Sequence, residues 1–74
     1  MFDMNQCKSG DKIVSQHGLV LEYIGIDEDK APYRHVVRYP DNRGDGSRLD
    51  NGMVFMNKPL PTDHNIVGFA EKDG

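Results

Sequence analysis

Apolar and polar positions alternate along the first half of the chain, in runs too short and too interrupted for long helices. The longest run, Leu19–Ile26, is rich in branched and aromatic side chains, and Gly25 and Pro32 oppose a helix there. The next run, Tyr33–Tyr39, has Tyr33, His35, Val37 and Tyr39 on one face and Arg34, Val36 and Arg38 on the other. We predict two strands joined by a charged turn, with the His35 and Val37 face inward because buried, unpaired guanidinium groups are costly.

Shorter segments flank this pair. Lys12–Ser15 and Ile66–Ala70 are predicted strands, and Asp41–Ser47 contains only turn-forming and polar residues, which indicates an exposed loop. Asn51-Gly52 favours a two-residue type I′ hairpin turn, which would set Asp50 opposite Met53 and Leu49 opposite Val54. Pro59 and Pro61 indicate a connection, with a 3₁₀ turn capped by Thr62 or Asp63 before the last strand.

The predicted core follows from this alternation. In Leu19–Ile26 two registers compete: one buries Leu19, Leu21 and Tyr23, the other Val20, Ile24 and Ile26, and a bulge at Gly25 would serve both in turn. The residues expected to be buried are Ile13, Leu21, Tyr23, Val37, Leu49, Val54, Ile66 or Val67, and Phe69.

Length and composition indicate one small domain, residues 1–74, with a lead-in at 1–8 and a polar tail at 71–74. The net charge of −3 does not suit a generic nucleic-acid binder. A single cysteine, no signal-peptide pattern and no long apolar run predict a cytoplasmic protein without a membrane partner.

The segment Gly10-Asp11-Lys12-Ile13-Val14, followed by Gly18 and a long second strand, resembles the opening of SH3-like barrels of the KOW and Tudor type. This resemblance implies an all-β, small SH3-like barrel of five or six short antiparallel strands. The chain lacks the extra basic residues of KOW domains, which counts against RNA binding. Its Asp50-Asn51-Gly52 hairpin and Asp63-His64-Asn65-Ile66-Val67 segment are also similar to short proteins of tailed bacteriophages.

Candidate catalytic and metal sites are weak. Cys7, His17, His35 and His64 have no zinc-ligand spacing, so we expect no metal and no cofactor. In the EF-hand pattern that begins at Asp41, Arg43 and Gly52 occupy ligand positions. We therefore expect a binding protein and not an enzyme.

The charge pattern gives the one candidate binding surface. Five basic residues and two acidic ones lie between Lys30 and Arg48. Guanidinium groups on strands suit carboxylate or phosphate, so the predicted binding residues are Arg34, Arg38 and Arg48, with Tyr33 or Phe55 adding apolar contact. Arg48 lies opposite Phe55 in the predicted hairpin, and Arg43 on the loop is expected to matter less.

Three functions fit these features. The phage resemblance implies an accessory protein that binds and inhibits or redirects a host protein, as in anti-defence or host takeover, in the host cytoplasm. The first alternative is a nucleic-acid-binding barrel that uses Arg34 and Arg38. The second is a homo-oligomer that sequesters a nucleotide signal between subunits.

Overall fold

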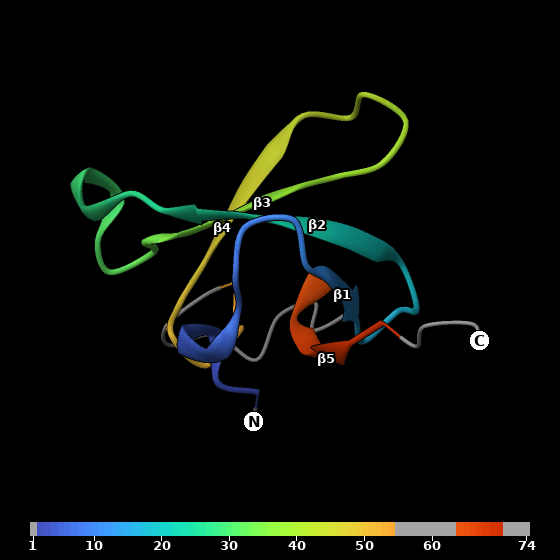
Figure 1. Cartoon of the computed structure of the whole chain (residues 1–74), viewed down its shortest axis with the longest axis horizontal. Coiled ribbons are helices and arrows are strands. Elements are labelled where there is room, and N and C mark those ends of the chain that lie inside the picture. Colours follow the sequence, from blue (N-terminus) through green and yellow to red (C-terminus); the bar gives the residue numbers. More distant parts are fainter. Residues whose placement is uncertain (1, 55–63, 71–74) are drawn as a thin grey trace.

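The computed structural model describes residues 2–54 and 64–70, which form an all-β fold (Figure 1). Five antiparallel strands make one sheet in the order β4-β3-β2-β1-β5. The strands are β1 (Lys12–Ser15), β2 (Val20–Ile26), β3 (His35–Arg38), β4 (Asp45–Arg48) and β5 (Ile66–Phe69). The predicted all-β fold of five or six short antiparallel strands is confirmed. Within the described ranges there is no helix long and apolar enough to cross a membrane.

The core lies on one face of the sheet, where the alternation predicted it. Ile13 pairs with Leu21 and Tyr23 pairs with Val37 across neighbouring strands, and each of the four is at most 2% exposed. Leu49 and Ile66 are also buried, as predicted, whereas Val54 is half-buried. The prediction for Phe69 is wrong: it is 45% exposed at the end of β5, whereas Ile66, at the start of the strand, is covered by the Gly52 turn.

A bulge in β2 settles the register of that strand. Tyr23 pairs with Val37 and Gly25 pairs with Val36, so Ile24 is an extra residue without a partner in β3. Leu21 and Tyr23 therefore point inward, and the competing register is wrong for Val20 and Ile26, which stay exposed.

The N-terminal segment closes one end of the core. Met4–Gln6 forms a 3₁₀ turn, η1, whose first amides are capped by the Asp3 carboxylate, which accepts a hydrogen bond from the Asn5 amide. The Met4 side chain is fully buried, and its amide donates to the Asp50 carbonyl at 2.8 Å. A three-residue turn has no repeating pattern, so the sequence predicted only an irregular lead-in here.

The β3–β4 connection is shorter than predicted, because β4 begins at Asp45, inside the expected loop. Asp41 and Asn42 have φ angles of 61° and 60°, and the Arg43 amide donates to the Pro40 carbonyl. Two consecutive positive φ angles inside such a hydrogen bond define a type I′ turn. The second 3₁₀ turn, η2 (Glu28–Lys30), forms the tip of the β2–β3 connection in Figure 1.

The predicted type I′ turn at Asn51-Gly52 is wrong. The Leu49 amide donates to the Met53 carbonyl and the Gly52 amide to the Leu49 carbonyl, so three residues, Asp50 to Gly52, form the turn. Gly52 alone of the Asn51-Gly52 pair has a positive φ. It also lies against β5, because its carbonyl accepts from the Ile66 amide, and a Cβ there would lie 2.5 Å from the Ile66 carbonyl oxygen. The predicted opposition of Arg48 and Phe55, the 3₁₀ turn at Thr62 or Asp63 and the tail at 71–74 lie outside the described residues.

Candidate functional site

The outer face of the sheet carries a row of alternating charges. Lys12, Glu22, Arg38 and Asp45 are successive partners across β1 to β4. Lys12 and Glu22 approach to 3.8 Å, and Arg38 Nε donates to Asp45 Oδ1 at 3.2 Å. Arg38 is exposed, as predicted, but it stands between two carboxylates, so this row offers little net positive charge to a phosphate.

Arg34 joins four segments of the chain. Its Nε donates to Asp50 Oδ1 at 2.8 Å, Nη1 to Glu28 Oε2 at 3.3 Å, and Nη2 to Asn5 Oδ1 at 2.7 Å. The hydrogen bond to Asp50 raises the pKa of Arg34, and the bonds from Arg34 and then His35 lower the pKa of Asp50. All three nitrogens of the Arg34 guanidinium group therefore donate hydrogen bonds within the chain.

Tyr23, His35 and Asp50 form a hydrogen-bonded chain beside Arg34, which runs from the buried Tyr23 to the Asp50 side chain, itself 56% exposed. Tyr23 Oη lies 2.7 Å from His35 Nδ1, and His35 Nε2 lies 2.8 Å from Asp50 Oδ1. The two ring nitrogens thus link the phenol to the carboxylate, and the tautomer of the ring sets which group donates in each bond. Burial raises the pKa of the Tyr23 hydroxyl, and both Tyr23 and His35 are at most 2% exposed. The geometry resembles a catalytic relay, but a substrate could not touch the hydroxyl.

Arg48 does not lie on the outer face of the sheet with Arg38. It pairs with His35, so its side chain enters the interior, where the residue is 2% exposed. Its Nε donates to the His64 carbonyl, Nη1 to the Ser47 carbonyl and Nη2 to the Tyr39 hydroxyl. The guanidinium carbon lies 5.7 Å from the centre of the Tyr39 ring, a cation–π contact. Arg48 therefore holds structure together and is not available to a ligand.

Of the two predicted aromatic residues, Tyr33 alone lies within the described residues. Tyr33 is half-buried and lines a shallow depression with Lys30, Ser47 and Val54. Phe55 lies outside the described residues. Arg34 and Arg38 thus have separate partners, Arg34 in η1, η2 and at Asp50 and Arg38 at Asp45 on β4, and Arg48 lies inside.

The free cysteine is a poor nucleophile. Burial, followed by the charges of Asp11 and Asp3, raises the pKa of the Cys7 thiol to about 11. A thiol with that pKa is almost fully protonated near neutral pH. Among residues 2–54 and 64–70, no three His, Cys, Asp or Glu side chains are grouped as metal ligands.

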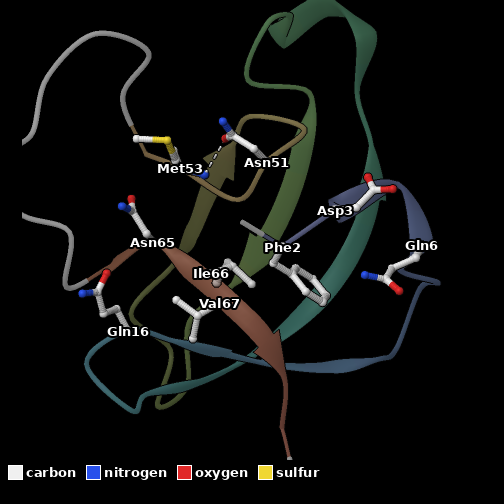
Figure 2. A pocket seen from close by; sticks show the side chains of 9 residues that line it. All are labelled: Phe2, Asp3, Gln6, Gln16, Asn51, Met53, Asn65, Ile66 and Val67. Carbon is white, nitrogen blue, oxygen red and sulfur yellow. Dashed lines mark hydrogen bonds between the residues drawn. The ribbon is translucent and has the colours of Figure 1, made fainter.

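The candidate site is a hollow beside β5, where the N-terminal segment, the Asp50–Gly52 turn and the edge strand meet (Figure 2). Its floor is apolar, and amide side chains stand around it, as Figure 2 shows. We call it the amide-rimmed hollow; its lining residues are Phe2, Asp3, Gln6, Gln16, Asn51, Met53, Asn65, Ile66 and Val67.

Apolar surface continues from the hollow along the edge strand. Val67 and Phe69 are 52% and 45% exposed, and the Phe2 ring packs edge-on against Phe69 at a centroid distance of 5.1 Å. The Ala70 amide donates to the Lys12 carbonyl, so the adjacent Ile13–Phe69 pair is a non-hydrogen-bonded one. The Phe69 amide and carbonyl consequently point away from β1, toward the edge.

Two asparagines at the rim are held in place by the backbone. Asn51 Oδ1 accepts from the Met53 amide at 3.1 Å, and Asn65 Oδ1 accepts from the Val54 amide at 2.9 Å. These bonds fix each carboxamide by its oxygen, so its NH₂ group is the part that can donate to a ligand.

The sequence did not predict this site. Phe2 fell in the lead-in, and Ile66 and Val67 were treated as alternatives for one core position, whereas both line the hollow, one buried and one exposed. The single available signal was the run of adjacent apolar residues in the last strand. In comparisons with protein-family models, curated proteins and solved structures, no match was found for this chain.

Proposed function

We propose that the chain is a non-catalytic module that binds another protein through the amide-rimmed hollow and the adjoining part of β5. The observation that supports this is the exposure of Val67 and Phe69 beside an apolar hollow. Contiguous exposed apolar surface with a polar rim is typical of interaction sites. The exposed Val20 also lines a depression, but charged side chains of Lys12, Glu22, Arg38 and Asp41 share that depression.

The chemistry of the nucleophilic groups supports binding over catalysis. Cys7 has a raised thiol pKa of about 11, and the Tyr23 hydroxyl is buried against His35. A nucleophile needs an accessible position and an adjacent base that can take its proton. Neither Cys7 nor Tyr23 meets both needs.

The arginine contacts weigh against the nucleic-acid alternative. A phosphate that approached Arg34 would compete with Asp50 and Glu28, and one at Arg38 would compete with Asp45. Non-specific nucleic-acid binding depends on cations that can neutralise phosphates. Nucleotide sequestration between subunits through these arginines would meet the same competition.

Two earlier expectations enter this proposal. The order β4-β3-β2-β1-β5 and the contact of Gly52 with Ile66, which brings the end of β4 to β5, support an SH3-like barrel. The resemblance to tailed-phage proteins makes a host protein the expected partner, and host takeover or anti-defence the expected role.

Affinity capture with matched baits tests the proposal. Val67→Glu places a charge in the hollow, and Ile26→Glu is its control, because Ile26 is equally exposed, at 52%, on another strand. Wild type and Ile26→Glu are expected to capture the same protein from a bacterial lysate, and Val67→Glu is expected to lose it, with all three baits showing cooperative melts. Capture by Val67→Glu at wild-type yield would contradict the proposal.

A further inference from the structure

The charges around the amide-rimmed hollow restrict what it can hold. Of its nine lining residues, Asp3 alone carries a charge, and the others are apolar or carboxamides. The carboxylate of Asp3 uses Oδ1 to cap η1, which leaves Oδ2 for another donor. A ligand with a carboxylate or phosphate next to Asp3 would be repelled, whereas a cationic group there would be attracted.

The hydrogen-bonding groups of the hollow match a peptide backbone. The NH₂ groups of Asn51 and Asn65 can donate to carbonyls, because their carboxamide oxygens are already engaged. Gln6 and Gln16, which are both exposed, add side chains that donate and accept. A polypeptide in extended form presents carbonyls and amides at regular spacing, so it can use both kinds of group.

The apolar floor matches a single bulky side chain. Phe2 lies across the hollow from Ile66 and Val67, which are neighbours on β5 (Figure 2), and Ile66 is 2% exposed, so it is part of the floor and not of the rim. Phe2 and Asp3 both line the hollow, so a cation paired with Asp3 would lie at its rim, near the apolar floor. In an extended peptide, two residues span about 7 Å, which places the cationic residue within about two positions of the apolar one.

From these observations we propose that the hollow binds an extended peptide segment of the partner, with a bulky aliphatic side chain on the floor formed by Phe2, Ile66 and Val67. A Lys or Arg one or two residues away pairs with Asp3. This inference rests on the proposed function and names the partner's chemistry at that site.

A second copy of this chain suits the hollow less well. A stable interface between folded proteins buries about 800 Å² on each side, which is roughly a sixth of the 4919 Å² surface of this chain. The few exposed apolar side chains at the hollow do not supply that area. The start of the β5 edge is also occupied, because the Ile66 amide donates to the Gly52 carbonyl.

The probe is the peptide acetyl-Ala-Leu-Ala-Lys-Ala-amide, titrated into ¹⁵N-labelled full-length protein and followed by amide chemical shifts. Two further peptides carry Ser for Leu or Glu for Lys. We expect shifts at Val67, Asn51 and Asn65, with affinity at least about tenfold lower for the Ser peptide and about two- to fivefold lower for the Glu peptide.

The variant Asp3→Asn isolates the charge, because Asn also caps a helical turn and so keeps η1 folded. In this variant the Lys and Glu peptides are expected to bind equally. Equal binding of all three peptides to wild type, a preference that survives Asp3→Asn, or shifts away from the hollow would each overturn the inference. The proposed function would then still be judged by the Val67→Glu bait, because that test depends on a captured protein and not on these peptides.

Discussion

Arg34 and Asp50 are joined by a 2.8 Å hydrogen bond from Nε to Oδ1, although they stand 16 residues apart in the chain. The same carboxylate oxygen lies 2.8 Å from His35 Nε2, and the other arms of Arg34 reach η1 and η2. Through its bond to Asn5, Arg34 links the residues beside β3 and β4 to the N-terminal segment that forms one wall of the hollow. Arg34, which the sequence predicted as a ligand-binding residue, therefore holds three segments of the fold together.

The first prediction contrasts Arg34→Ala with Arg38→Ala. Arg34 makes three side-chain hydrogen bonds to three different segments, whereas Arg38 makes one, to Asp45 on the neighbouring strand. An exposed single pair contributes little to stability, so Arg38→Ala should leave the melting temperature almost unchanged and Arg34→Ala should lower it by several degrees. Equal melting temperatures for the two variants, measured by circular dichroism, would contradict the structural role of Arg34.

The second prediction concerns acid. Hydrogen bonds from Arg34 and His35 lower the pKa of Asp50 in the folded state, so its stabilising contribution is present above the unfolded-state pKa, near 3.9. That contribution is lost as the pH falls through the folded-state pKa. Urea unfolding should show wild type more stable than Asp50→Asn at pH 7, with the difference shrinking below about pH 4. A difference that is constant from pH 7 to pH 2.5 would refute this linkage.

The third prediction uses Cys7. With a thiol pKa of about 11, roughly one thiol in a thousand is ionised at pH 8. Ellman's reagent should therefore react with the folded protein at least about tenfold more slowly than with the urea-unfolded protein, whose thiol pKa is near 8.5, because the smaller thiolate fraction outweighs the higher nucleophilicity of a thiolate of raised pKa. Similar rates for both states would show that Cys7 is accessible and ionised in the fold.

The fourth prediction tests the core. Val37 is fully buried and pairs with Tyr23, so Val37→Ala should lower the free energy of unfolding by about 2 kcal/mol. Val20→Ala is the control, because Val20 is 45% exposed and should change stability by less than about 0.5 kcal/mol. Denaturant midpoints measure both, and an unchanged midpoint for Val37→Ala would place Val37 outside the core.

Alternation predicted β1, β2, β3, β5 and most of the core, because each of Ile13, Leu21, Tyr23 and Val37 lies on a strand with a buried and an exposed face, but it missed β4, which begins inside the expected loop. It was wrong for Phe69, because Ile66 is buried and Phe69 is exposed on the same strand, and which of them is covered depends on residues distant in sequence, such as Gly52. Asn51-Gly52 was misread because a glycine with positive φ suits both a two-residue and a three-residue turn. The contact of Gly52 with Ile66 distinguishes them, and it joins residues far apart in sequence.

The candidate site was less predictable than the fold. Charge counting identified Arg34 and Arg38 as candidates. It did not show that Asp50 and Glu28 would form ion pairs with Arg34, or that Asp45 would form one with Arg38. Arg48 was expected on the surface, yet carbonyls of Ser47 and His64 satisfy it inside. The hollow is formed by the two ends of the chain and the hairpin turn, so no local motif marks it.

The most direct test is calorimetric titration of the captured partner into wild type, Val67→Glu and Arg38→Glu. The proposed hollow predicts that Val67→Glu weakens binding at least about tenfold, because it places an unpaired charge in an apolar contact. The affinity of Arg38→Glu should stay within about twofold of that of wild type, because the Arg38–Asp45 ion pair is exposed and lies outside the proposed interface. Strong loss of affinity with Arg38→Glu and wild-type affinity for Val67→Glu would move the site to the outer face of the sheet around Arg38 and contradict the account.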